Sequence, residues 1–183
     1  MKKVLYITGN QKKLDNAKAF LVEYDIEPES RKVESDEIQS NDAVAIAVQK
    51  ARDAYAELQQ PLFVNDASWH IPALNGFPGP YMRYIVDWFN SDDLLKLMDG
   101  KTDRTIILKD TIVFKDGDIE KIFTNDVHGV LLDAPAGEGD GPFVTKLISF
   151  DDNGLSIAEA KVVGYSDKEK PLWRAFAEWY KDV

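Results

Sequence analysis

The chain has 183 residues, of which 44% are hydrophobic and 30% are charged, and its formal net charge is −10. This length and composition fit one globular domain over residues 1–183, large enough to bury a sizeable core. The acidic balance argues against a nucleic-acid partner, because polyanion binding depends on lysines and arginines that release counterions. The chain contains no cysteine, which excludes a disulfide framework, a thiolate metal site and a thiol nucleophile.

The hydrophobic segments are too short to cross a membrane. None approaches the roughly 20 apolar residues that a membrane helix requires. The first apolar run, residues 4–7, is cut short by a polar Thr-Gly-Asn, which is typical of a strand and not of a signal peptide. We therefore expect a cytoplasmic protein without a membrane partner.

The first third of the chain predicts alternating strands and helices. Residues 4–8 are typical of a strand, and Gly9 and Asn10 turn the chain into a helix over about 11–24. A second strand is expected at 31–34. Apolar residues then recur at three- and four-residue spacing: Val44, Ala47, Val48, Ala51, Ala54, Tyr55 and Leu58. This spacing predicts a helix that packs on a sheet.

The middle of the chain continues this alternation. Residues 62–65 are expected to form a buried strand, and 81–89 a helix. A further helix over 94–98 is expected to be capped by Ser91-Asp-Asp and closed by Gly100.

The remaining elements indicate a hairpin beside these α/β units. Two β-rich runs at 105–114 and 119–130 are joined by Lys-Asp-Gly-Asp, which is a strong hairpin signal. A strand at 143–150 and a last helix over 173–181 are expected to follow. Together these patterns predict an α/β fold with a mixed sheet.

The loop after the first strand, Thr8-Gly-Asn-Gln-Lys-Lys13, is a candidate anion cradle. Gly9 allows close approach of a ligand, the helix that follows offers free N–H groups, and Lys13 adds a positive charge. The alternative is an ordinary strand-to-helix turn with an asparagine cap and a solvated lysine pair.

Asp66 is the candidate catalytic carboxylate. It follows a short apolar run and precedes a segment rich in turn residues, Ala73-Leu-Asn-Gly-Phe-Pro-Gly-Pro-Tyr81. Hydrolysis of a phosphoanhydride needs a carboxylate that positions Mg²⁺ and the attacking water. The alternative is an aspartate that stabilises the turn.

These two motifs together resemble the Ham1-like inosine/xanthosine triphosphate pyrophosphatases. Thr8-Gly-Asn-Gln-Lys-Lys13 matches that family's triphosphate-binding motif, and residues 73–81 match the string that follows its catalytic aspartate. The resemblance extends to Gln49-Lys-Ala-Arg52 in the second helix, to Ala134-Pro-Ala-Gly137, and to the Lys168 and Arg174 pair near the end.

The resemblance implies an elongated mixed sheet flanked by helices, with two lobes around a central nucleotide cleft, and a homodimer. It implies a hydrolase of nucleotide metabolism that cleaves a non-canonical purine nucleoside triphosphate to the monophosphate and pyrophosphate with Mg²⁺. Asp66 would be catalytic and a metal ligand, and Glu37 a second metal ligand. The residues implied to bind substrate are Thr8, Gly9, Asn10, Lys13, Lys50, Lys168 and Arg174.

The chain departs from the family pattern at several positions. Asn16 and Asn65 stand where the family carries acidic residues, and Ala67 stands in place of a hydroxyl. The base-recognition loop, Glu138-Gly-Asp-Gly-Pro142, has no aromatic, and of the family's Ser-His-Arg only Arg174 is kept. These losses are expected to weaken Mg²⁺ binding and to alter recognition of the base.

Two further readings stay open, the first from these departures and the second from composition alone. One is a non-catalytic nucleotide-binding or structural relative that has lost its metal carboxylates. The other is a protein-interaction module that uses the acidic surface and the aromatic last helix. Trp69 and Trp173 either offer a replacement stacking face for a base or, as we favour, pack in the core.

Overall fold

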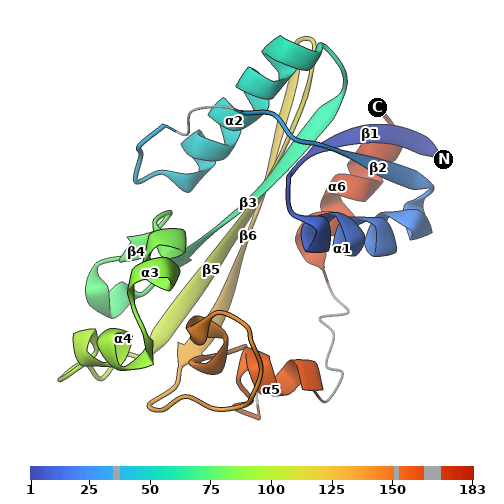
Figure 1. Ribbon diagram of the computed structural model, residues 1–183. Helices are drawn as coiled ribbons and strands as arrows, with labels where there is room; N and C mark the ends of the chain where they lie inside the picture. The colour runs from blue at the N-terminus through green and yellow to red at the C-terminus, as the bar shows by residue number, and fades with distance from the viewer. Residues whose placement is uncertain (35–37, 151–152, 163–169) are drawn as a thin grey trace. The chain divides into compact units, whose positions relative to one another are not determined.

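The computed structural model describes residues 1–34, 38–150, 153–162 and 170–183, and within these ranges it contains one mixed sheet of seven strands (Figure 1). The strands are β1 (Lys2–Ile7), β2 (Ile26–Arg31), β3 (Leu62–His70), β4 (Pro78–Gly79), β5 (Thr105–Asp116), β6 (Ile119–Leu131) and β7 (Ile148–Ser149). Their order is β2-β1-β3-β5-β6-β7, and β4 pairs with β3. β1 runs parallel to β2 and β3, whereas β4 and β7 run antiparallel to their neighbours.

Helices connect and cover these strands. The α-helices are α1 (Gln11–Leu21), α2 (Ala43–Leu58), α3 (Met82–Trp88), α4 (Ser91–Leu97), α5 (Ile157–Val162) and α6 (Pro171–Lys181). Short 3₁₀ turns are η1 (Val22–Tyr24), η2 (Pro72–Leu74) and η3 (Phe143–Lys146). None of the helices in the described ranges is long and apolar enough to span a membrane.

The chain divides into two compact units. The first comprises Met1–Asp66, Asp110–Asn125 and Lys170–Val183, and the second comprises Ala67–Lys109 and Asp126–Glu169. Strands β3, β5 and β6 therefore each contribute residues to both units.

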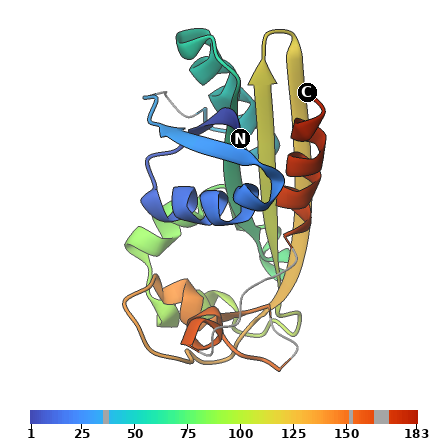
Figure 2. The same ribbon diagram turned by 90° about the vertical axis from the view of Figure 1, so that its right-hand side faces the viewer.

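In the first unit, β1 is buried on both faces. Val4 and Tyr6 belong to one hydrophobic cluster with side chains of α1 and α6, whereas Leu5 and Ile7 belong to another with α2. Successive side chains of a strand point to opposite faces, so a strand covered on both sides becomes a continuous apolar run. Figure 2 shows α1 beside the strands and α6 along the β5–β6 hairpin.

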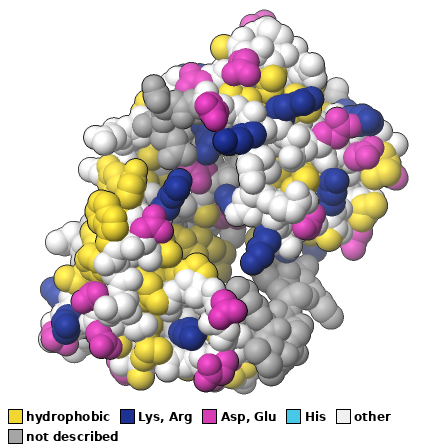
Figure 3. Space-filling model, viewed as in Figure 1, with side chains coloured by type: hydrophobic (Ala, Val, Ile, Leu, Met, Phe, Trp, Pro, Cys, Tyr) yellow, Lys and Arg dark blue, Asp and Glu magenta, His cyan; other side chains and the backbone are white. Residues whose placement is uncertain are grey.

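The second unit has a core of its own. It is built from buried apolar residues of β5, β6, β7, η3, α3 and α4 and of the segments next to them: Ile71, Met82, Ile85, Leu94, Met98, Ile106, Leu131, Val144, Leu147 and Ile148. Hydrophobic side chains also reach the surface around α3 (Figure 3). Tyr84 and Trp88 are 51% and 73% exposed, and their ring centroids lie 5.3 Å apart.

Most of the regular patterns are confirmed by the structure. The helix expected at 11–24 is α1 followed by η1, the alanine-rich helix is α2 packed on the sheet, and the hairpin is β5–β6. The helices expected near 81–89, 94–98 and 173–181 are α3, α4 and α6. The expected cap of α4 is wrong: Ser91, Asp92 and Asp93 lie inside the helix, and Asn90 caps it by accepting from the Asp93 N–H.

One predicted strand has the wrong position, and another is mostly not a strand. The strand expected at 31–34 is β2, which lies earlier, over Ile26–Arg31, where Glu27 and Glu29 alternate with the buried Ile26 and Pro28. The stretch 143–150 is mostly the turn η3 and only a short β7, because Thr145 folds back and donates its N–H and its hydroxyl to the carbonyl of Pro142.

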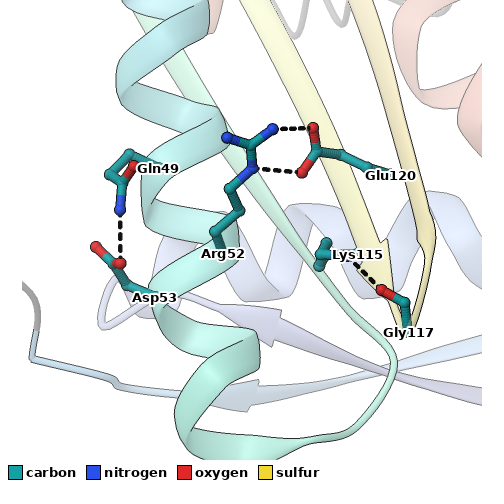
Figure 4. A network of polar contacts seen from close by, with 6 residues as sticks. All are labelled: Gln49, Arg52, Asp53, Lys115, Gly117 and Glu120. Carbon is teal, nitrogen blue, oxygen red and sulfur yellow. Dashed lines mark hydrogen bonds and ion pairs between the residues drawn. The ribbon is translucent and has the colours of Figure 1, made fainter.

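An ion pair ties α2 to the β5–β6 hairpin in the first unit (Figure 4). Arg52 donates through Nε to Glu120 Oε2 and through Nη2 to Glu120 Oε1, both at 2.7 Å. On the same helix Gln49 donates to Asp53, and in the hairpin Lys115 donates to the Gly117 carbonyl. The hydrogen bonds from Arg52 lower the pKa of Glu120.

A Glu with a lowered folded pKa stabilises the protein above its unfolded pKa, about 4.3, and this contribution is lost as the pH falls through the folded pKa. We expect Arg52→Gln to lower the melting temperature at pH 7, less so at high salt. The difference from wild type should shrink as the pH falls below the unfolded pKa, about 4.3, and should disappear only below the lowered folded pKa of Glu120. Arg83→Gln, at an exposed position, is the control in thermal melts across pH. A wild-type advantage that is as large at pH 3 as at pH 7 would contradict this role of the ion pair.

Candidate functional site

The loop between β1 and α1 is held by its own polar side chains. The Asn10 side chain caps α1 and accepts from the N–H groups of Lys12 and Lys13 at 3.0 and 3.3 Å. The Thr8 hydroxyl accepts from the Asn10 N–H at 3.1 Å. A Cβ on Gly9 would make ordinary van der Waals contact with the Lys32 side chain, at 3.7 Å, so the flexible Lys32 lies beside the loop. The asparagine cap of the alternative reading is present, and it occupies two of the N–H groups that the cradle reading expects to be free.

Lys13, in the first turn of α1, contacts strand β3 with its side chain. Its ammonium donates to the backbone carbonyl of Asn65 at 3.0 Å, and the side chain is half-buried. This hydrogen bond places the positive charge next to the residue that precedes Asp66 in the strand.

Asn65 connects three strands through its side chain. Its Nδ2 donates to Asp110 Oδ1 at 2.5 Å and to the Thr111 carbonyl at 3.2 Å, both on β5. Its Oδ1 accepts from the hydroxyl of Tyr6, on β1, at 3.5 Å. The amide is therefore held in one orientation between a donor and two acceptors.

The charges around this amide influence one another. Burial raises the pKa of Asp110, while the hydrogen bond from Asn65 and the charge of Lys13 oppose that rise and the charge of Asp66 adds to it. Burial, together with the charges of Asp110 and Asp66, also raises the pKa of Tyr6. The Tyr6 hydroxyl consequently stays protonated and acts as a donor, beside two carboxylates and one ammonium.

Asp66 lies within a strand and not at the start of a loop. The chain stays extended to His70, because Ala67-Ser-Trp-His contains no residue that breaks a strand. Asp66 is half-buried and is the last residue of this segment of the first unit. The expectation that the strand ends at 65 is therefore wrong.

The turn that follows β3 belongs to the second unit. Asn75, Gly76 and Gly79 adopt positive φ angles of 55°, 87° and 60°, as the Asn-Gly signal predicts. The His70 ring lies against both glycines, and its Nε2 is 2.9 Å from the hydroxyl of the buried Ser68. Burial lowers the pKa of His70, which favours the neutral imidazole.

The remaining candidate binding residues that the structure describes lie on the helices α2 and α6. Lys50 lies half-buried on α2, and Arg174 is exposed near the start of α6. Asn16 is exposed on α1. Glu37 and Lys168 lie outside the described residues.

Trp69 and Trp173 pack against core aromatic residues, as we favoured from the sequence. Trp173 is edge-on to Tyr6 and Phe63, with ring centroids 6.1 and 6.0 Å apart. Trp69 packs on Phe150 at 5.8 Å in the second unit, from a strand and not from a helix.

Sequence reasoning missed Asp110. Its signal is a carboxylate in the middle of β5, within the run Ile106-Ile-Leu-Lys-Asp-Thr-Ile112, which has no other acidic residue. Among the described residues, no group of three or more His, Cys, Asp or Glu side chains forms a metal cage. Mg²⁺ is nevertheless commonly held by one or two carboxylates together with substrate phosphates, so the Asp66 neighbourhood has suitable donors.

Solved structures share this fold. A HAM1 protein from Coxiella burnetii superposes with a TM-score of 0.84 at 16% identity over 100% of both chains. The Ham1 protein of Staphylococcus aureus gives 0.79 at 18% identity over 99% of both.

Sequence comparison gives the family. The model of the Ham1 family matches residues 4–161. A dITP/XTP pyrophosphatase from Methanopyrus kandleri is 35% identical over 98% of this chain and 97% of its own length. One from Methanosarcina mazei is 32% identical over 98% of both. The chain belongs to the Ham1 family.

The Asn10 cap makes a stability prediction. Asn10→Ala should cost about 1 kcal/mol of unfolding free energy, or roughly 2–4 °C in melting temperature. Asp42→Ala should cost a similar amount, because Asp42 caps α2 through the N–H groups of Val44 and Ala45 at 2.9 and 3.2 Å. Asn10→Ser should keep most of the stability. An unchanged melting temperature for Asn10→Ala would show that the cap contributes nothing.

Proposed function

We propose that this protein hydrolyses a nucleoside triphosphate to a nucleoside monophosphate and pyrophosphate. Full-length relatives that are named dITP/XTP pyrophosphatases support this proposal. The observation that carries it is the convergence of the α1 N-terminus, through Lys13, on the segment of β3 that bears Asp66.

The phosphates would bind at the loop 8–13. The N-terminus of α1 carries the positive end of the helix dipole, which favours an anion, and beside Gly9 only the side chain of Lys32, itself a cation, would have to move. Lys13 donates to a neutral carbonyl, so it can exchange this acceptor for a phosphate oxygen without breaking an ion pair. Lys50, Arg174 and Lys168 would add positive charge.

Asp66 would orient the attacking water and accept its proton. Asp66 and Glu37 would hold Mg²⁺, which when bound neutralises phosphate charge and polarises the phosphoryl group. Tyr6 and Asn65 would keep the strand that carries Asp66 fixed during the reaction.

The substrate would be a non-canonical purine nucleotide, as the relatives' names suggest. The segment 138–142 offers no aromatic side chain to the base. Selection would therefore depend more on polar contacts to the purine edge than on stacking.

A non-catalytic nucleotide-binding protein is the second candidate. It is favoured by the amides at Asn16 and Asn65, which leave few carboxylates for a metal. The assay below separates the two functions.

Pyrophosphate release should be measured with dITP, XTP and the standard nucleoside triphosphates, with Mg²⁺ or Mn²⁺. We expect turnover of at least one deaminated purine nucleotide, and Asp66→Asn should lower kcat by about 10²–10⁴-fold, the range for loss of a general base. Asp92→Asn, an exposed carboxylate on α4, is the matched control. Nucleotide binding without any turnover in the wild type would favour the non-catalytic alternative.

We also propose a homodimer, which the family resemblance implies. The exposed rings of Tyr84 and Trp88 in the second unit support a self-association surface there. Light scattering should give twice the mass of one chain. Trp88→Lys should shift the protein toward the monomer, whereas Ile119→Lys, at an exposed apolar residue of the first unit, should not. A wild-type mass of one chain would refute the dimer.

A further inference from the structure

The least expected part of the cluster is the Asp110 carboxylate. It is half-buried on β5, the neighbour of β3 in the sheet, and lies 2.5 Å from the amide nitrogen of Asn65. Burial of a carboxylate is costly unless it is hydrogen-bonded or paired with a cation. Asn65 supplies the hydrogen bond and Lys13 the nearby positive charge.

Asp110 fixes the orientation of the Asn65 side chain. The amide nitrogen has two acceptors on β5, while the amide oxygen accepts from Tyr6. A flipped amide would set its oxygen against the Asp110 carboxylate. The backbone of Asn65, which receives Lys13 and precedes Asp66, is thereby anchored from its side chain.

Asp110 also contributes negative charge to the site. This charge helps to raise the pKa of Tyr6, and the charges of Lys13 and Asp66 in turn lower and raise the pKa of Asp110. A cation held by Asp66 would be attracted by this second charge as well, because Coulomb interactions are strong where water is partly excluded. Asn65 itself is neutral, so within the Asn65–Asp110 pair the carboxylate belongs to β5 and the amide to β3.

We propose that Asp110 is a positioning residue of the pyrophosphatase site, which anchors Asn65 and supplies negative charge that favours a divalent cation beside Asp66. The proposal rests on the function proposed above. Its particular content is that the carboxylate and the amide of the Asn65–Asp110 pair are exchangeable with respect to the cation, since either arrangement gives one charge and one hydrogen bond between the two side chains; the exchange removes only the bond to the Thr111 carbonyl.

Three variants test this exchange. Asp110→Asn removes the charge and keeps the shape and an acceptor oxygen. Asn65→Asp alone sets two carboxylates against each other. The double variant Asn65→Asp/Asp110→Asn restores one carboxylate and one amide in exchanged positions. Asp116→Asn, on the same strand, is the control, because Asp116 acts on Tyr180 and not on this cluster.

Mn²⁺ affinity, measured by electron paramagnetic resonance without nucleotide, is the primary readout. We expect Asp110→Asn to weaken Mn²⁺ binding by about tenfold, and the double variant to recover to within about threefold of wild type. In the pyrophosphate assay the metal concentration for half-maximal rate should follow the same order. Thermal melts report whether each variant is folded, and the double variant decides the matter if Asp110→Asn does not fold.

Unchanged Mn²⁺ affinity in Asp110→Asn, or a double variant as weak as the single one, would overturn the role of Asp110. These results are independent of turnover. A wild-type protein that releases no pyrophosphate but shows the exchange pattern would refute the proposed function and keep the charge role of Asp110. Pyrophosphate release by the wild type, combined with an unchanged Mn²⁺ affinity in Asp110→Asn, would support the proposed function and refute the role of Asp110.

Discussion

The burial of β1 on both faces is the constraint on which the site depends. Because Tyr6 faces α1 and α6 while Leu5 and Ile7 face α2, one strand fixes the helices on both sides of the sheet. The loop that leaves this strand, with Asn10 capping α1, must then place Lys13 beside β3. The candidate phosphate loop and the candidate carboxylate are thus brought together by core packing, and the polar contacts only refine their positions.

The same packing explains how polar groups are tolerated beside the core. Tyr6 is fully buried and stacks on Phe63, with ring centroids 4.5 Å apart, yet its hydroxyl reaches Asn65. An aromatic ring with one polar end can belong to a hydrophobic cluster and still take part in a hydrogen-bond network. Such a network is sensitive to the loss of any member, because a buried group left without a partner costs more than the bond itself contributed.

Sequence patterns predict the elements better than they predict contacts between strands. The spacing of apolar residues finds α2, and the Asp-Gly turn finds the β5–β6 hairpin, since both signals are local. Lys13 and Asp66 are found by resemblance to a family. Asp110 is missed because its partner Asn65 is 45 positions away in the chain. The residues of one strand do not determine which residues of the neighbouring strand lie opposite them. β2 is displaced for a related reason: its polar and proline residues hide a strand that tertiary pairing with β1 imposes.

The two ends of the described chain are fastened to each other within the first unit. Lys2 donates its ammonium to the Tyr180 carbonyl at 2.8 Å, and the Tyr180 hydroxyl donates to the Lys3 carbonyl at 2.9 Å. The core beneath β1 is therefore incomplete until α6 has left the ribosome, although β1 is synthesised well before α6. Contacts between such distant segments slow folding. The nascent chain must carry an uncovered apolar face throughout synthesis of the second unit, and it is then most exposed to aggregation and to chaperones.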